Sequence, residues 1–194
     1  MIGIVIVGVG GQGTLLASKI LGRIALQHGY DVRVSEVHGM SQRGGSVVTY
    51  VRMSETEPVY STLVEQEQAD TVLAFEQLEA LRALPYVKPV TGTVIVNMQR
   101  IPPMPVITGA AVYPEDALAR IQAAAPHTVA LDATAIAAEC GSHRAANVVL
   151  LGVLAKQLPF SREAWMEALA ATVKPQFLEM NQAAFERGYT YEGA

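Results

Sequence analysis

The feature that most constrains the fold is an apolar strand that leads into a glycine-rich turn and then a helix. Residues 2–7 are almost all apolar and β-branched, as expected of a strand buried on both faces of a parallel sheet. Apolar residues recur at helical spacing over 15–25, and Gly29 can supply a left-handed helix end. Because residues 30–37 have the pattern of a second strand, the segment is predicted to form a right-handed β-α-β unit.

The rest of the chain continues the alternation of strands and helices. We expect further strands at 46–53, 69–75, 93–97 and 128–132, with an antiparallel orientation open for the first of these. Helices are expected at 76–84, 114–125, 133–139, 147–156, 161–172 and 175–187, and the prolines of 98–105 predict a loop or an edge excursion. The predicted fold class is α/β: a three-layer, Rossmann-like, mostly parallel sheet with helices on both faces and a helical C-terminal third.

Composition narrows the classes of function. A chain of 194 residues with 51% hydrophobic residues can bury the core of one domain. Its net charge of −4 gives no reason to expect nucleic-acid binding. We expect a cytoplasmic protein without a membrane span, because no basic leader or sufficiently long apolar run is visible. The single cysteine, Cys140, cannot alone hold an iron–sulfur cluster or a structural zinc, so we expect no metal on this chain.

The turn after the first strand carries a Gly-x-Gly-x-x-Gly spacing. Small residues let backbone amides approach an anion, and the following helix start adds unpaired donors and a positive dipole end. The turn is not a P-loop, because Thr14-Leu15 stands where lysine and a hydroxyl residue are required. A tight turn also needs glycine for packing, so a purely structural role is open. The candidate cofactor-binding residues are Gly8, Gly10, Gly11, Gln12, Gly13 and Thr14.

A second polar, glycine-rich loop follows the second predicted strand. Glu36 has the spacing of the acidic residue that holds ribose hydroxyls in dinucleotide sites, which keeps an NAD hypothesis open. Arg43 offers a forked cation for a phosphate or carboxylate, although it could instead be solvated or paired. His38 could act in acid–base chemistry or only as a structural hydrogen-bonding residue. The candidate substrate, coenzyme A or interface residues are Glu36, His38, Met40, Ser41, Gln42, Arg43, Gly44, Gly45 and Ser46.

The two loops are predicted to lie side by side. Each follows a strand of the same β-α-β unit, and open α/β sheets bind ligands in the crevice outside the carboxyl ends of their strands. We therefore expect both loops to line one crevice.

With both loops in view, the chain resembles the small subunit of indolepyruvate ferredoxin oxidoreductases. That subunit is itself similar to the gamma domain of pyruvate and other 2-oxoacid:ferredoxin oxidoreductases. The glycine loop and Arg43-Gly44-Gly45 carry the wider resemblance, and residues 35–46 carry the narrower one. Later stretches at Ala69-Asp70, Glu79 to Arg82, Asn147 and Lys174-Pro175 extend it over nearly the whole chain.

The resemblance implies one gamma-type domain over residues 1–194 and an enzyme that is inactive without its partner. It implies oxidative decarboxylation of an arylpyruvate to an aryl-acetyl-CoA, with electrons passed to ferredoxin. Thiamine diphosphate and iron–sulfur clusters would be carried by a large partner subunit, and no cofactor would be held by this chain alone. Both loops would face the partner's cofactor or coenzyme A. Asn147 is a weaker candidate, because it could be only a helix N-cap.

Two other functions stay open from the residues. A free-standing NAD(P)- or FAD-dependent Rossmann oxidoreductase would use Glu36 for the ribose. A ligand sensor without catalysis has no specific support in the sequence. No chemical step is assigned to any single residue.

Overall fold

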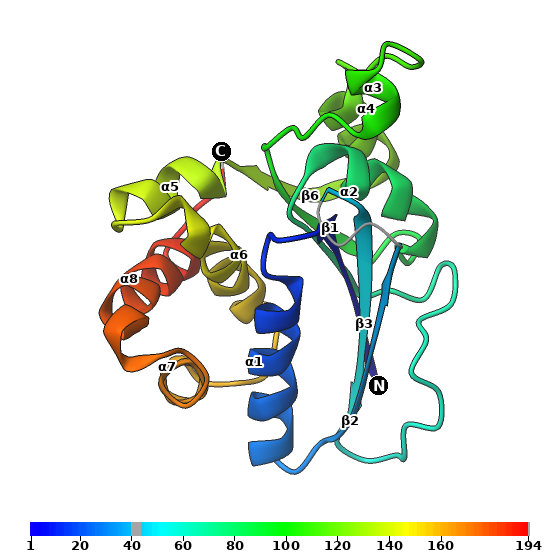
Figure 1. Cartoon of the computed structure of the whole chain (residues 1–194). Helices are drawn as coiled ribbons and strands as arrows, with labels where there is room; N and C mark the ends of the chain where they lie inside the picture. Colours follow the sequence, from blue (N-terminus) through cyan, green and yellow to red (C-terminus); the bar gives the residue numbers. More distant parts are fainter. Residues whose placement is uncertain (40–43, 194) are drawn as a thin grey trace.

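A computed structural model describes residues 1–39 and 44–193. Within these residues, six strands form one sheet in the order β2-β3-β1-β4-β5-β6 (Figure 1). Met40, Ser41, Gln42 and Arg43 of the second candidate loop lie outside the described residues. The strands are β1 Ile2–Val9, β2 Asp31–His38, β3 Ser46–Ser54, β4 Thr71–Ala74, β5 Thr93–Asn97 and β6 His127–Leu131.

The sheet is mixed, with a parallel half and an antiparallel edge. β1, β4, β5 and β6 pair in parallel, whereas β3 runs antiparallel to both β1 and β2. The expected α/β fold is confirmed, and the orientation of β3 left open by the sequence is antiparallel. β3 also separates β1 from β2, because the chain folds back along β2 and inserts β3 between the strands of the first β-α-β unit.

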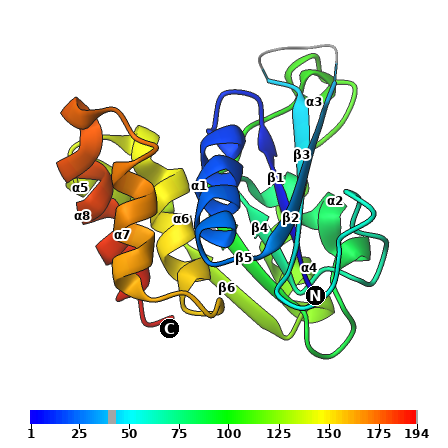
Figure 2. The ribbon, with the colours of Figure 1, turned by 90° about the horizontal axis from the view of Figure 1, so that it is seen from below.

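Helices cover both faces of the sheet, as the sequence predicted (Figure 2). Along β1, Ile4 and Ile6 belong to the core under one helical layer, whereas Val5 and Val7 belong to the core under the other. This alternation follows from the two-residue period of a strand. The first layer comprises α1 Thr14–Gln27, α5 Ala133–Glu139, α6 Ala146–Ala155, α7 Arg162–Ala170 and α8 Leu178–Tyr189, and the second comprises α2 Gln77–Ala83 and α4 Ala117–Ala124.

The helical C-terminal third is built around α6. Every residue of α6 after Ala146 is buried, as expected of a helix that is apolar on all sides. α6 packs against α8 through two glycines: a Cβ atom on Gly152 would lie 2.2 Å from the backbone oxygen of Phe185, and one on Gly188 would lie 1.9 Å from that of Val149. The two backbones approach this closely because neither glycine carries a side chain.

Helix boundaries follow the local capping chemistry. The Ser161 side chain accepts from the backbone NH of Ala164 at 3.2 Å, and Asp132 caps α5 by accepting from Ala135 at 2.9 Å. Single 3-10 turns lie at η1 Leu84–Tyr86, η2 His143–Ala145 and η3 Pro175–Phe177. Among the described residues, no helix combines the length and apolar character needed to cross a bilayer.

One local prediction was wrong. The prolines of residues 98–105 were expected to exclude regular structure, yet the short helix α3 spans Met104–Ile107. Pro103 is its N-cap and Pro105 lies in its first turn, where the missing NH would have no helical acceptor. This segment projects from the carboxyl end of the sheet (Figure 1).

Candidate functional site

The glycine loop lies at the carboxyl ends of the parallel strands, beside the second loop. The backbone NH of Gly10 donates to the carbonyl of Gly45 at 2.8 Å. The sequence prediction that the two loops are neighbours is therefore confirmed at these residues. Gly11 and Gly13 have φ values of +102° and +89°, a region that side-chain-bearing residues seldom adopt. The turn therefore needs glycine at both positions.

Two cavities flank this loop. The helical cavity, of about 640 Å³, lies between the glycine loop and the α5–α6 region, and its lining includes Gly13, Asn97, Gln99, Thr134, Arg144 and Asn147. The strand cavity, of about 410 Å³, lies between the glycine loop and β2, and its lining includes Gly10, Thr14, Glu36 and His38. Gly11 and Gly13 line both, so the loop is a wall between them.

A hydrogen-bonded amide network forms the floor of the helical cavity. Gln12 Oε1 accepts from the NH of Val9 at 2.7 Å, and its Nε2 donates to Gln99 Oε1 at 2.9 Å and to the carbonyl of Phe75 at 3.0 Å. Asn97, at the end of β5, donates to Thr134 Oγ1 at 3.0 Å and accepts from the NH of Ala133 at 3.0 Å. The network holds the ends of β1, β4 and β5 to the start of α5.

Asn147 joins α6 to the glycine loop. Its Nδ2 donates to the carbonyl of Gly13 at 3.3 Å, and its side chain is buried. A Cβ atom on Gly13 would lie 2.4 Å from this Nδ2. The N-cap alternative for Asn147 was wrong, because α6 begins one residue earlier, with Ala145 as its N-cap. The local pattern could not show that Asn147 packs against a residue far away in the sequence.

The strand cavity is chemically different from the helical one. Glu36 is exposed and accepts a hydrogen bond from Thr49 Oγ1 at 3.2 Å. His38 is also exposed, and its Nδ1 lies 3.3 Å from the carbonyl oxygen of Gly39. In the usual dinucleotide-binding order the first and second strands are neighbours. Here β3 lies between them, so the sheet does not have the strand order of the usual dinucleotide site, although Glu36 lines the strand cavity together with the glycine loop.

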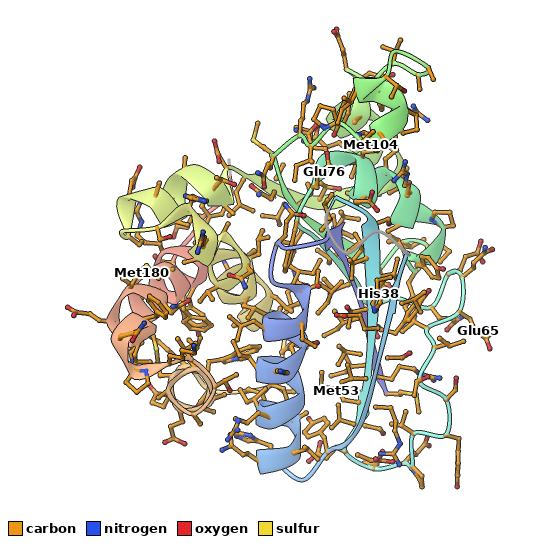
Figure 3. The ribbon with its side chains drawn as sticks, viewed as in Figure 1. His38, Met53, Glu65, Glu76, Met104 and Met180 are labelled. Carbon is orange, nitrogen blue, oxygen red and sulfur yellow. The ribbon has the colours of Figure 1, made fainter. Side chains whose placement is uncertain are left out.

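Two buried carboxylates at the start of α2, its N-cap Glu76 and Glu79 of its first turn, hold the segments around the site. Glu79 accepts from Ser46 Oγ at 2.5 Å, at the start of β3, and pairs with Arg82 at 2.6 Å. Glu76 accepts from the NH of Ile101 at 3.1 Å and from the hydroxyl of Tyr113. Burial, and then the hydrogen bond to Glu76, raises the pKa of Tyr113. Glu76 thereby anchors the projecting segment that carries Met104 (Figure 3).

The structure distributes the candidate residues over distinct places. Gly10, Gly11, Gln12, Gly13, Thr14 and Asn147 lie together around the loop. Gly8 lies within β1, where a Cβ atom would approach Gln12 Oε1 to 2.9 Å. Gly44 and Gly45 precede β3, and Ser46 is held by Glu79.

Several residues that line the helical cavity were not predicted from the sequence. Asn97 had a usable signal, since it ends a predicted parallel strand at the ligand-binding edge. The others carry no motif, because they follow different elements and meet only in the folded chain: Phe75, Gln99, Thr134, His143 and Arg144. In the part of the chain that the structure describes, no group of three or more His, Cys, Asp and Glu residues is placed to share a metal ion.

Known proteins with similar sequences have names that agree with the resemblance. The chain is 45% identical over 190 residues to the indolepyruvate oxidoreductase subunit IorB of Thermococcus kodakarensis, which covers 95% of this chain and 93% of that protein. It is 44% identical, at the same coverage, to the subunit of the same name from Pyrococcus horikoshii.

Solved structures have a similar fold. The keto/oxoacid ferredoxin oxidoreductase gamma subunit of Geobacter sulfurreducens PCA has a TM-score of 0.71 at 24% identity, over 97% of this chain and 96% of that one. A 2-oxoglutarate:ferredoxin oxidoreductase of Magnetococcus marinus, with 2-oxoglutarate, coenzyme A and succinyl-CoA bound, has a TM-score of 0.74 at 21% identity, over 97% of this chain and 30% of that one.

The family model described as pyruvate ferredoxin/flavodoxin oxidoreductase matches residues 3–191. This match covers nearly the whole chain and includes both loops. The chain therefore belongs to the pyruvate ferredoxin/flavodoxin oxidoreductase family.

Proposed function

We propose that this chain is the small subunit of an indolepyruvate:ferredoxin oxidoreductase. The enzyme would oxidatively decarboxylate arylpyruvates to aryl-acetyl-CoA and pass the electrons to ferredoxin. The observation that carries the proposal is the 45% identity to an indolepyruvate oxidoreductase subunit over 95% of the chain. The strand order does not favour the NAD(P)- or FAD-dependent alternative, because β3 separates β2 from β1.

The proposal assigns the redox cofactors to a large partner subunit. An iron–sulfur cluster does not fit this chain, whose only cysteine is Cys140. Thiamine diphosphate, when bound to the partner, would supply the electron sink for decarboxylation. The chain would act as one gamma-type domain over residues 1–194, a proposal supported by the family match to residues 3–191.

The residues of this chain would form part of the wall of the shared active site. The amides of Gly11 and Gly13 and the side chains around the helical cavity offer hydrogen-bond donors to an anionic group. The strand cavity, with Glu36 and His38, would face the partner or its substrate. The chain's role is then to bind and orient ligands, whereas bond breaking belongs to the partner's cofactor.

Reconstitution tests the proposed function. Purified chain should show no arylpyruvate-dependent reduction of ferredoxin or viologen, and activity should appear when the thiamine-binding partner is added. Indolepyruvate should give a higher kcat/KM than pyruvate or 2-oxoglutarate. Turnover by this chain alone would contradict the proposal, as would a complex that prefers a short aliphatic 2-oxoacid.

A further inference from the structure

We propose that the helical cavity is a phosphate-binding site in which Arg144 is the principal cation. Arg144 was not among the candidate residues that the sequence indicated. The proposal depends on which hydrogen-bonding groups the fold leaves free, on the charges that line the cavity and on the backbone of the glycine loop.

The amide network uses its acceptors internally and leaves donors facing the cavity. Oε1 of Gln99 accepts from Gln12 at 2.9 Å and from Asn97 at 3.4 Å. Its Nε2, in contrast, has no acceptor among the described residues. Thr134 Oγ1 accepts from Asn97 at 3.0 Å, so its hydroxyl hydrogen remains available. A cavity lined by free donors favours an acceptor-only group, and a phosphate is such a group.

The charge of the cavity points the same way. Arg144 lines it, and no carboxylate lies among the described residues that line it. Arg144 is exposed and takes part in none of the ion pairs between described residues. The strand cavity contains Glu36, which would repel an anion. Judged by the described residues that line them, the helical cavity is therefore the better anion site of the two.

The glycine loop supplies backbone donors to the same place. Gly13 is the N-cap residue of the 14-residue helix α1, which has no side-chain cap and no acidic residue in its first turn. The NH groups of Gly11 and Gly13 have no acceptor among the described residues. Unpaired amides at the positive end of a helix dipole stabilise a bound anion, and both glycines line the cavity that also contains Arg144.

Which phosphate-bearing ligand occupies the cavity rests on the proposed function. Two ligands of such a complex carry a diphosphate: coenzyme A and thiamine diphosphate. A cavity of about 640 Å³ is large enough for a diphosphate and part of the attached group. The chemistry of the cavity itself does not depend on the complex, so it can be tested on the chain alone.

Titration of the full chain with inorganic pyrophosphate, followed by NMR, tests the site. We expect the backbone amides of Gly11 and Gly13 and the side-chain amide of Gln99 to shift. The variant Arg144→Ala should weaken binding about tenfold or more, with partial recovery in Arg144→Lys. The matched control Arg120→Ala removes an exposed arginine of α4 whose nearest charged partner is Asp116, at 4.0 Å, and should leave binding unchanged.

Three results would overturn the proposal: no shift of these amides, equal binding by Arg144→Ala, or shifts at His38 in place of Gln99. Because this assay needs no partner, its failure is separate from failure of the reconstituted activity.

Kinetics of the assembled enzyme then identify the source of the phosphate. If coenzyme A is the ligand, Arg144→Ala raises the KM for coenzyme A with little change in kcat. The KM for pantetheine, which lacks the diphosphate, is then the same for wild type and variant. If thiamine diphosphate is the ligand, the variant raises the concentration of thiamine diphosphate needed for full activity. An Arg144→Ala complex with both requirements unchanged would contradict a phosphate site at this position.

Discussion

At the scale of single residues, Gly13 is the most constrained position of the site. Replacing it with alanine should destabilise the chain by about 1–2 kcal/mol from the left-handed backbone conformation alone, and further because the new methyl group meets Asn147 Nδ2 at 2.4 Å. Gly11→Ala is the matched control, since its φ is also positive but nothing lies within 4 Å of its Cβ. The free energy of unfolding, measured with denaturant, should be highest for wild type, lower for Gly11→Ala and lowest for Gly13→Ala.

A double mutant isolates the contact. In the background Asn147→Ala, the extra cost of Gly13→Ala over Gly11→Ala should shrink, because the clashing amide is gone. An undiminished cost would show that Asn147 is not the cause. The sequence predicted a tight turn that needs glycine, in agreement with the positive φ of Gly11 and Gly13. It could not predict the contact, because Asn147 is 134 positions from Gly13 and carries a pattern that also fits a helix cap.

At the scale of helices and strands, the contact between α6 and α8 depends on two glycines. Gly188→Ala should destabilise the chain by about 1–3 kcal/mol or more by overpacking, although alanine is the better helix former. Gly22→Ala in α1 is the control: its nearest neighbour is Val34 Cγ2 at 3.9 Å, so helix propensity should stabilise it by roughly 0.5–1 kcal/mol. In thermal unfolding, Gly188→Ala should lower the melting temperature and Gly22→Ala should raise it. A lower melting temperature for both variants would contradict this expectation.

Most helices and strands could be predicted from the sequence, because apolar spacing and end-forming residues act within one element. β5 and α5 begin and end where expected, since the apolar run of β5 and the glycine that follows α5, Gly141, are visible in the sequence. The position of β3 between β1 and β2 could not be predicted, because strand order depends on pairing between distant segments. The helix α3 was missed because proline is excluded from a helix interior but tolerated in its first turn.

At the scale of the whole molecule, large apolar side chains are exposed on the segment that projects beyond the sheet. Met104, Ile107 and Val112 are 65%, 66% and 88% exposed. The net charge is −4 and the isoelectric point is near 5.6, so repulsion between copies is weakest near that pH. Light scattering of the isolated chain should show the greatest association there. Ile107→Lys should reduce it more than Leu26→Lys, which adds the same charge on α1, and equal effects would contradict this.

The glycine loop has a consequence for how the two cavities are used. Gly11 and Gly13 line both of them, yet each backbone NH can donate in only one direction at a time. An anion on the side of Arg144 would turn these amides away from Glu36 and His38. Groups on the two sides of the loop would therefore compete for the same donors, and the occupant of one side would set the affinity of the other by the same factor in both directions.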